Sequence, residues 1–483
     1  MKAEFESVLV PAQAILKEVL AVIDRSGLGV ALVANDHRQL MGLVTDGDLR
    51  RAILEGRALD TPVHTIMNTD PVTARAGTSR QNVLAMMDYV IRHIPVLDES
   101  RRVCDLVCFN ELSRNIPFAV PNLGEEEECE VVDAFRSTWL SMGPRVRAFE
   151  EQVASYLGTK HAIAVNSGTA ALDVALKVLG IRPGDEVIIP AFTYIATANA
   201  VLYQHAVPVF ADIDPRTFNI DPNEVVERIT AKTKCLISID YGGHSADYDA
   251  LRRITEEHGI YLLQDGAHSI GADYKGQKLC TLGAINTISF HAAKVVTSIE
   301  GGMIITDDDD FASAARIIRN QGEDPAKKYH HVLLGHNYRM TDLHAAIGLR
   351  QFARLSDLLK KRKEVADYYT RQLNELRGAV TIPHVEPEIT HAWFFYPILV
   401  NNRDEVVHYL KSKGIDTRIA WPLPVNKQPV YAPTHGHLHY PVTEAVSSRI
   451  LNLPIYPEMT DRDLDYVIIH LKDAIAQTAG IRA

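Results

Sequence analysis

The segment SFHAAKVVTSIEGG, residues 289–302, raises the question that decides how the whole chain is interpreted. It places one lysine, Lys294, among small and apolar neighbours and ends in the pair Gly301-Gly302. A lysine held in such dry surroundings has a lowered pKa, because desolvation disfavours the ammonium form. The neutral amine could then form a Schiff base with an aldehyde. A lysine at the edge of a buried strand, with its amine reaching solvent, fits the same pattern, so the rest of the chain has to decide.

The composition is typical of a soluble globular protein with more than one domain. A chain of 483 residues exceeds what one core usually supports and predicts about two to four domains. Hydrophobic residues make up 46% and charged residues 23% of the sequence. The net charge of -11 argues against nucleic acid as a partner, although a local basic pocket for a diphosphate is compatible with it.

The cysteines and the hydropathy pattern indicate where the protein works. Five cysteines are scattered without a CxxC pair, which argues against a disulfide framework and against a zinc site, so we expect no metal. The acidic start MKAEFESVLV lacks the apolar core of a secretory signal. No stretch of about 18 apolar residues predicts a membrane span, and we therefore expect a cytoplasmic protein with no membrane partner.

The first part of the chain contains an internal repeat. Residues 29–54 and 93–112 each contain a strand, a polar turn, a second strand and a helix start. Thr45 or Asp46 is expected to cap the first of these helices. The proline-flanked segment NIPFAVPN, residues 115–122, then predicts an extended connector. The acidic segment GEEEECE, residues 124–130, predicts a solvated helix start.

Over about residues 5–118, this repeat resembles the tandem CBS domains. The spacing Gly42-x-x-Thr45-x-x-Asp48 carries the resemblance. It implies an α+β pair in which Thr45 and Asp48 contact the ribose and phosphate of an adenine nucleotide such as AMP or ATP. The corresponding positions of the second copy depart from this pattern and hold Asp105, Cys108 and Glu111. We therefore expect at most one competent half-site, and a pair that only helps subunits associate fits the sequence as well.

From about Arg145 the pattern changes to apolar strands that alternate with helical stretches, which predicts an α/β domain with a largely parallel sheet. The clearest predicted strands are residues 162–165, 186–190, 207–213, 234–240, 260–265 and 303–307. After about Leu355, a charged helix and shorter elements predict a smaller α+β domain at the C-terminal end. The expected domains are residues 1–118, 119–355 and 356–483.

Four features fall at the C-terminal ends of these predicted strands, where open α/β sheets bind ligands. The turn NSGT, residues 166–169, opens a helix whose free N–H groups suit a phosphate. Phe192 and Tyr194 follow the next strand, and one of them could stack on a flat heterocycle. Asp265 ends a strand, where a carboxylate could pair with a protonated pyridine nitrogen. Lys294 is the fourth feature.

Each feature alone also fits a structural role, as a helix cap, a core aromatic or a turn cap. Phosphate turn, aromatic ring, aspartate and lysine together are nevertheless the set that pyridoxal 5′-phosphate (PLP) requires. Over about residues 116–480 the chain resembles the DegT/StrS-type sugar-nucleotide aminotransferases, which are fold-type I PLP enzymes. The segments that carry this resemblance are NIPFAVPNLGEEE, STWLSMGPRVRAFE, VNSGTAAL, PAFTYIATANAV, QDGAHSIGADYKG, SFHAAKVVTSIEGG, HNYRMTDLHAAIG and LNLPIYP.

The resemblance implies an α/β fold with a mostly parallel, seven-stranded-type sheet and a small α+β C-terminal domain. It implies that Lys294 bonds the cofactor and moves a proton, while Asp265 holds the pyridine nitrogen. The further cofactor-binding residues that it implies are Gly168, Thr169 and Ser289 at the phosphate, Tyr194 stacked on the ring, His268 beside the ring, and Asn337, which reaches the phosphate from the neighbouring subunit. A homodimer or a higher oligomer is therefore expected.

The implied reaction moves the amino group of L-glutamate to a nucleotide-linked keto sugar. Residues 289–302 and DYGGHSADYDAL, residues 240–251, resemble members that act at C4 of a UDP- or GDP-linked 4-keto-6-deoxy sugar, in amino-sugar and polysaccharide (including lipopolysaccharide) biosynthesis. The segment 418–431 is expected to shape the sugar-nucleotide pocket. Relatives that act at C3 more often carry Tyr-Pro near residues 290–292, and related dehydratases replace the lysine with histidine.

A different class of function is a nucleotide-sensing regulator whose transaminase-like body has lost turnover. The retained Lys294 and Asp265 argue against that alternative and for an enzyme.

Overall fold

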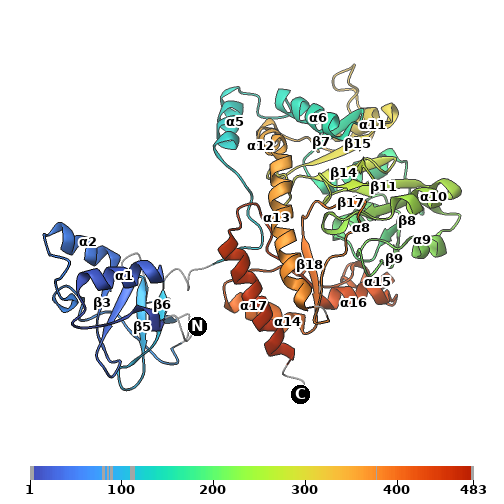
Figure 1. Ribbon diagram of the computed structural model, residues 1–483. Coiled ribbons are helices and arrows are strands. Elements are labelled where there is room, and N and C mark those ends of the chain that lie inside the picture. The colour runs from blue at the N-terminus through green and yellow to red at the C-terminus, as the bar shows by residue number, and fades with distance from the viewer. Residues whose placement is uncertain are drawn as a thin grey trace. The chain divides into compact units, whose positions relative to one another are not determined.

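The computed structural model describes residues 5–78, 82–83, 86–87, 91–108, 115–376 and 378–479, so Glu111 lies outside the described residues. The chain divides into two compact units, Met1–Asn115 and Ile116–Ala483, each of which is described by itself (Figure 1). The sequence placed the first boundary after residue 118. Ile116 and Phe118, however, are buried in the apolar clusters of the second unit, where the extended connector was expected.

The first unit contains two small sheets built in the same way. In one, β2 (Val30–Ala34) lies between β1 (Leu9–Pro11), which is parallel to it, and β3 (Leu40–Thr45), which is antiparallel. In the other, β5 (His93–Leu97) lies between the parallel β4 (Ala74–Arg75) and the antiparallel β6 (Val103–Cys108). This shared arrangement confirms the repeated strand, turn and strand, whereas the predicted helix start of the second copy lies outside the described residues.

Helices and a common apolar cluster complete the first unit. Helices α1 (Leu16–Ser26) and α2 (Asp46–Leu54) belong to the first copy. Leu32 and Leu43 from the first sheet and Leu97 and Leu106 from the second belong to one buried cluster. The two copies therefore share a core and stabilise each other through the burial of apolar surface.

The second unit is built on a seven-stranded sheet with the strand order β7-β15-β14-β11-β10-β8-β9. The strands are β7 (His161–Val165), β8 (Glu186–Pro190), β9 (Val207–Ala211), β10 (Thr233–Ile239), β11 (Tyr261–Asp265), β14 (Ile285–Ser289) and β15 (Gly302–Thr306). Only β15 runs against its neighbours, β7 and β14. The other six strands share one direction, so their carboxyl ends meet at the same edge, which confirms the predicted, mostly parallel sheet.

Helices cover both faces of this sheet. Successive side chains of each strand point to opposite faces, so each face has its own apolar layer that a set of helices buries. Helices α7 (Gly168–Val178) and α8 (Ile195–Tyr203) pack on one face, together with α11 (Asp309–Arg319). The other face is covered by α6 (Pro144–Leu157), α10 (Tyr248–His258) and α12 (Asp342–Ala353). Helix α9 (Pro222–Arg228) lies between strands β9 and β10 in the chain.

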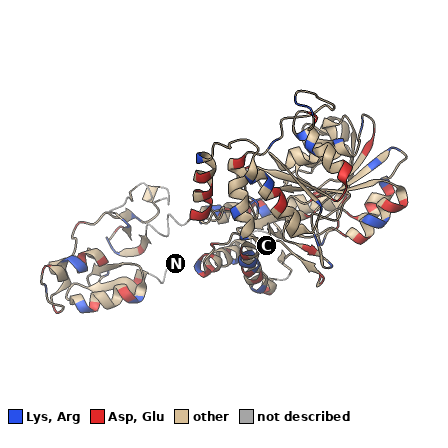
Figure 2. Cartoon of the chain, turned by 90° about the horizontal axis from the view of Figure 1, so that it is seen from above, with Lys and Arg blue, Asp and Glu red and all other residues tan. Residues whose placement is uncertain are grey.

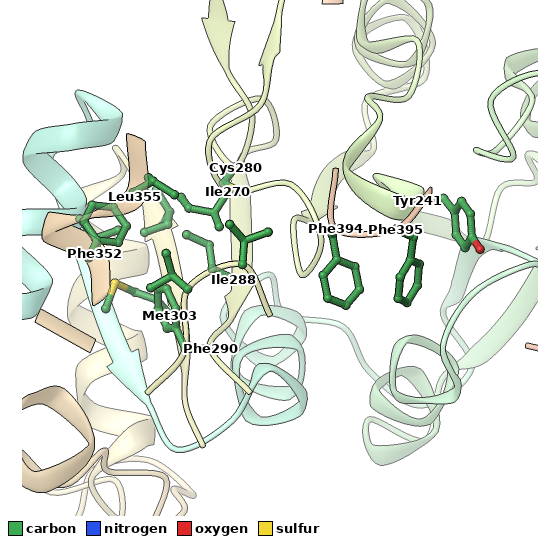
Figure 3. Close-up of a cluster of buried hydrophobic side chains, with 14 of the residues drawn as sticks. Tyr241, Ile270, Cys280, Ile288, Phe290, Met303, Phe352, Leu355, Phe394 and Phe395 are labelled. Carbon is green, nitrogen blue, oxygen red and sulfur yellow. The ribbon is translucent and has the colours of Figure 1, made fainter. Parts of the chain in front are cut away.

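Aromatic side chains fill the layer between α6, α12 and the sheet. Phe290, at the end of β14, has no exposed surface, and its ring centroid lies 4.9 Å from that of Phe149. Figure 3 shows Phe290 and Met303 in this layer, near Phe352. Of the apolar residues around Lys294 in the sequence, Phe290, Val295 and Val296 are thus core residues, and they fix the backbone on which that lysine stands.

The C-terminal part of the second unit begins with the long helix α13 (Leu355–Leu373) and has the α+β character that the sequence predicted. Its antiparallel sheet consists of β16 (Val380–Thr381), β18 (Tyr396–Val400) and β19 (Ile450–Leu453). Helices α14 (Arg403–Ser412), α16 (Pro441–Arg449) and α17 (Asp461–Ala479) accompany this sheet, and α15 (Ala432–His435) is a single turn. A small separate sheet joins β12 (Asp273–Tyr274), β13 (Gln277–Lys278) and β17 (Ile389–Thr390).

Charged side chains of both signs lie on the helices of both units (Figure 2). The acidic segment begins helix α5 (Glu125–Arg136), as predicted. The expectation of a wholly solvated run is wrong for Glu127, which is buried and forms an ion pair with Arg354. Among the residues that the structure describes, no helix combines the length and apolar character needed to cross a membrane.

Candidate active site

A cavity of about 880 Å³ opens at the carboxyl ends of the parallel strands. Its lining contains seven of the eight residues that the sequence predicted to bind the cofactor, namely Gly168, Thr169, Tyr194, Asp265, His268, Ser289 and Lys294. The eighth, Asn337, is exposed and does not belong to the lining. The fold therefore brings together groups from four different strand ends, as the strand directions require.

The start of helix α7 offers backbone donors to this cavity. The Ser167 hydroxyl caps the helix by accepting a hydrogen bond of 3.1 Å from the N–H of Ala170. Gly168 and Thr169 form the first turn, where N–H groups have no partner within the helix. A Cβ at Gly168 would lie only 2.9 Å from the Cβ of Ser289, so glycine lets the end of β14 approach the helix start. A hydroxyl beside a helix N-terminus fits a phosphate group.

Asp265, at the end of β11, provides a buried carboxylate. Its Oδ2 accepts a hydrogen bond of 3.0 Å from the Thr197 hydroxyl, and its Oδ1 accepts one of 3.2 Å from the N–H of Ala267. Burial raises the pKa of Asp265, because the charged form loses its hydration, while these hydrogen bonds and the charge of Lys294 act in the opposite direction. A cationic ring nitrogen in this cavity would give that carboxylate its counter-charge.

Lys294 stands on a turn that leaves β14 and returns to β15. The backbone of Phe290 closes this turn, because its N–H donates to the carbonyl oxygen of Gly301 and its own carbonyl accepts from Ser298, both at 2.9 Å. The Nζ of Lys294 lies 4.4 Å from the ring centroid of Phe394. Burial lowers the pKa of Lys294 to about 8, although the charge of Asp265 opposes this shift. The lysine is thus poised between its charged and neutral forms near physiological pH.

His268 is a neutral, buried imidazole in the same cavity. The N–H of Gly242 donates to its Nδ1 at 3.3 Å, which leaves the ring proton on Nε2. Burial holds the pKa of His268 well below its usual range, and the charge of Lys294 acts in the same direction. The centroid of its ring lies 4.4 Å from that of the Phe394 ring and 5.9 Å from that of the Trp421 ring, to which it is nearly parallel. Figure 3 shows Phe394 beside Phe395, away from the main aromatic layer.

The two aromatic candidates after β8 have different surroundings. Phe192 is fully buried and packs against Tyr241 and Trp421, with ring centroids at 5.1 and 4.8 Å. Tyr194 precedes helix α8 and is 58% exposed while lining the cavity. Tyr194 therefore has a ring face available to a ligand, and Phe192 has none.

Sequence reasoning missed three residues that complete this site. Thr197 holds Asp265, Phe394 lies under the Lys294 amine, and Trp421 lies parallel to His268. Thr197 is three residues after Tyr194, the N-cap residue of helix α8, so helical spacing could have suggested it. Phe394 reaches the site only through the packing of the C-terminal part, for which no local pattern exists. Trp421 falls inside the segment that was expected to shape the pocket.

In the first unit, Thr45 and Asp48 form a helix cap. Thr45 precedes α2, and its N–H and hydroxyl donate to Asp48 Oδ2 at 2.8 and 2.7 Å. Asp48 also forms an ion pair with Arg51. A Cβ at Gly42 would lie 2.8 Å from the carbonyl oxygen of Asn68, whose backbone pairs with β3. The three motif residues thus have structural roles of their own, which leave nucleotide binding by Thr45 and Asp48 as a prediction.

Comparisons with known proteins match both units. The model of the DegT/DnrJ/EryC1/StrS aminotransferase family matches residues 121–472, and that of the CBS domain matches residues 5–55 and 63–117. GDP-perosamine synthase of Caulobacter vibrioides is 40% identical over 369 residues, which cover 74% of this chain and 98% of that protein. UDP-2-acetamido-2-deoxy-3-oxo-D-glucuronate aminotransferase of Pseudomonas aeruginosa is 37% identical over 317 residues, 65% of this chain and 87% of its own.

A solved structure gives the same result for the fold. The PLP-form of the putative sugar aminotransferase Spr1654 from Streptococcus pneumoniae superimposes with a TM-score of 0.72 at 29% identity. The matched residues make up 75% of this chain and 99% of the Streptococcus chain. The aminotransferase family match begins at residue 121, after the residues that match the CBS domain.

The pKa of Lys294 can be tested without any assumption about the reaction. We expect acetic anhydride to acetylate Lys294 of the cofactor-free protein with half-maximal rate near pH 8, because only the neutral amine reacts and burial lowers its pKa to about 8. Mass spectrometry of tryptic peptides measures the rate, with the exposed Lys234 in the same sample as the reference for the reagent. In the Asp265→Asn variant the midpoint should move to lower pH, because the opposing charge is lost. A midpoint near the usual value of 10.5, or an upward shift in the variant, would contradict this account.

Proposed function

Because the chain belongs to the DegT/DnrJ/EryC1/StrS aminotransferase family, whose members depend on PLP, we propose that it moves the amino group of L-glutamate to a keto sugar linked to a nucleotide. The observation that supports this most strongly is the meeting of Lys294, Asp265 and the N-terminus of helix α7 in one cavity. These are the groups that a PLP enzyme needs for covalent attachment, for the ring nitrogen and for the phosphate.

The residues of the cavity would divide the cofactor between them. PLP supplies an aldehyde for the amine and an electron-withdrawing pyridine ring. The backbone of Gly168, the backbone and hydroxyl of Thr169, and the Ser289 hydroxyl would hold the phosphate. Asp265, kept in place by Thr197, would hold the ring nitrogen through a charge-assisted hydrogen bond. Tyr194 offers an open ring face for stacking, and His268 would lie beside the ring.

Lys294 would also act as the acid and base of the reaction. A general base works best when its pKa lies near the working pH, and burial lowers the pKa of Lys294 to about 8. Its amine would take the proton from the amino-bearing carbon of glutamate and deliver it to the cofactor C4′. The apolar ring of Phe394 beneath the amine would exclude water from that proton transfer.

For the sugar, we propose C4 of a UDP- or GDP-linked 4-keto-6-deoxyhexose, in amino-sugar and polysaccharide biosynthesis in the cytoplasm. Residues 289–302 and 240–251 support C4 by their resemblance to members with that specificity. The name of the Caulobacter relative contains GDP, whereas the Pseudomonas relative is named for a UDP-linked 3-oxo sugar. The latter keeps a C3-keto sugar as the second candidate. The free thiols of the five cysteines fit a reducing compartment.

The proposal predicts a complete half-reaction with glutamate alone. The purified holoprotein should be yellow and should bleach when L-glutamate is added, and UDP- or GDP-linked 4-keto sugars should then yield amino sugars by mass spectrometry. Lys294→Ala should lower turnover at least about 1000-fold, because it removes the covalent and the proton-transfer roles together. Lys234→Ala, at an exposed position of β10, should retain turnover.

A yellow protein that no amino donor bleaches would instead favour the regulator without turnover. Product formed only from 3-keto sugars would favour the second candidate.

We further propose that Asn337 completes the phosphate site of a neighbouring subunit in a homodimer. Asn337 is exposed, while its neighbours are anchored: the Tyr338 hydroxyl donates to the buried Asp173 at 3.1 Å, and the N–H of His336 donates to the carbonyl oxygen of Ile318 at 2.7 Å. A side chain on such a fixed segment, outside its own cavity, is suited to a partner. The exposed apolar side chains Phe135 and Trp139, 67% and 59% accessible, offer a surface for association.

Subunit mixing tests this shared site. Asn337→Ala should weaken cofactor binding about tenfold, because one hydrogen bond to a charged group is lost. Co-refolding Asn337→Ala with inactive Lys294→Ala should restore about a quarter of wild-type activity at limiting PLP, because half the dimers are mixed and each contains one intact site. If Asn337 served its own subunit, the mixed dimers would contain no intact site and mixing would add no activity.

For the first unit, we propose that AMP or ATP binds at Thr45 and Asp48 and changes the rate of aminotransfer. The tandem CBS match and the Gly42-x-x-Thr45-x-x-Asp48 spacing support this proposal. Binding would have to compete with the mutual hydrogen bonds of Thr45 and Asp48, which cap helix α2. The alternative is that the pair only helps subunits associate.

Calorimetry on the full chain tests this nucleotide site. Asp48→Asn should weaken AMP or ATP binding about tenfold, whereas Asp105→Asn, at the exposed position of the second copy that corresponds to Gly42, should leave it unchanged. Saturating nucleotide should change the rate of aminotransfer about fivefold. Equal loss in both variants would contradict a half-site at Thr45 and Asp48. Binding without any change in rate would leave assembly as the role of the pair.

A further inference from the structure

One wall of the cavity carries an arginine that the cofactor does not need. Residues Asp416, Arg418, Ile419, Ala420 and Trp421 line the cavity together. Within the described residues, the guanidinium of Arg418 forms no side-chain hydrogen bond, and its carbon lies 5.3 Å from the centroid of the Phe118 ring. No carboxylate in the described part of the chain forms an ion pair with it. A guanidinium in this setting has its hydrogen-bond donors available to a ligand.

The backbone of Arg418 is held in place by Asn452, which is fully buried in strand β19. The two residues exchange backbone hydrogen bonds of 3.1 and 2.8 Å, and Asn452 Nδ2 donates to the carbonyl oxygen of Arg418 at 3.0 Å. The same Asn452 side chain accepts a hydrogen bond of 3.2 Å from the Tyr241 hydroxyl. Tyr241 packs 5.1 Å from Trp421, which lies parallel to His268. Arg418 is therefore connected through Asn452, Tyr241 and Trp421 to the side of the cavity that contains His268.

Phe118 supports the side chain of Arg418 from one face. The guanidinium carbon lies over this aromatic ring, where a cation–π interaction attracts it, and no N–H group of the guanidinium donates a hydrogen bond within the described residues. Phe118 itself is buried against Phe395, with ring centroids at 5.8 Å. A planar fork held in this way matches the two oxygens of a carboxylate or of a phosphate better than a lysine would.

Among the described residues, the basic side chains that line the cavity are His268, His291, Lys294 and Arg418. Lys294 is committed to the cofactor under the proposed function, and His268 is held neutral. The two acidic side chains near the mouth, Glu300 and Asp416, would repel an anion, although Glu300 lies 3.8 Å from His291. Arg418 is thus the cavity-lining group, among the described residues, with a permanent and unpaired positive charge.

We propose that Arg418 is the oxyanion-binding residue of the active site and pairs with an anionic group of the substrates. This inference rests on the proposed function, in which both substrates are anions: L-glutamate brings carboxylates, and the nucleotide sugar brings a diphosphate. The geometry favours a bidentate pair in which Phe118 backs the guanidinium and the ligand faces its edge. The experiment separates the two sources of the anion.

Two measurements on Arg418 variants test the proposal. One is the affinity of the holoprotein for UDP and for GDP, by calorimetry, and the other is the glutamate concentration that gives half-maximal bleaching of the bound cofactor in single turnover. Arg418→Ala should weaken at least one of these about 10- to 100-fold, because charge-assisted hydrogen bonds are lost. Arg418→Lys should recover part of the loss, because it restores the charge but not the planar guanidinium that can form two parallel hydrogen bonds. Arg253→Ala, at an exposed position of α10, is the matched control and should change neither.

The outcomes distinguish a carboxylate from a diphosphate as the bound anion. They also distinguish a failure of this proposal from a failure of the proposed function. Weaker glutamate bleaching alone assigns the carboxylate, weaker UDP or GDP binding alone assigns the diphosphate, and both together assign a site that the substrates use in turn. If Arg418→Ala, with unchanged thermal unfolding, keeps both values within twofold of wild type, the proposal is overturned. A wild-type protein that glutamate does not bleach refutes the proposed function, while UDP and GDP binding still tests Arg418. If wild-type protein binds neither nucleotide and does not bleach, both proposals fail.

Discussion

The structure depends on the mutual electrostatic influence of Lys294 and Asp265 in a cavity that excludes much of the solvent. Burial alone would push both groups towards neutrality, since it lowers the pKa of Lys294 and raises that of Asp265. The charge of each group opposes the pKa shift of the other, and the resulting pKa of Lys294 is about 8. This influence requires the ends of β11 and β14 to be neighbours. The parallel register that pairs Asp265 with Thr287, seven residues before Lys294, provides that arrangement.

The rest of the second unit maintains this arrangement. Aromatic packing of Phe149 on Phe290 fixes the turn that carries Lys294. Glycine at 168 lets the start of helix α7 approach Ser289. The C-terminal part closes the cavity with Phe394 below the lysine and with the wall that carries Arg418. Under the proposed function, the wall that carries Arg418 would recognise the substrates, while the strand ends that carry Asp265 and Lys294 would hold the cofactor.

The sequence predicted the parts of the site that lie at strand ends, because apolar runs followed by polar turn residues are local signals. The turn at residues 166–169, Asp265 and Lys294 were found in this way. Thr197 and Phe394 were not, since their roles arise from packing between segments far apart in the chain. The connector contains no helix, as predicted, but the burial of Ile116, which pairs with Ile415, is a contact that no local pattern reveals. Thr45 and Asp48 cap helix α2, and spacing alone cannot distinguish such a cap from a ligand site.

The most direct test of the account is the site of covalent attachment. Borohydride reduction of the holoprotein, followed by tryptic digestion and mass spectrometry, should find the pyridoxal phosphate mass on the peptide that contains Lys294 and on no other. The Asp265→Asn variant should still carry this label while losing its reactivity towards glutamate, since the carboxylate serves the ring and the lysine serves the attachment. A label on a different lysine, or a wild-type protein that binds PLP without any reducible bond, would contradict the central claim.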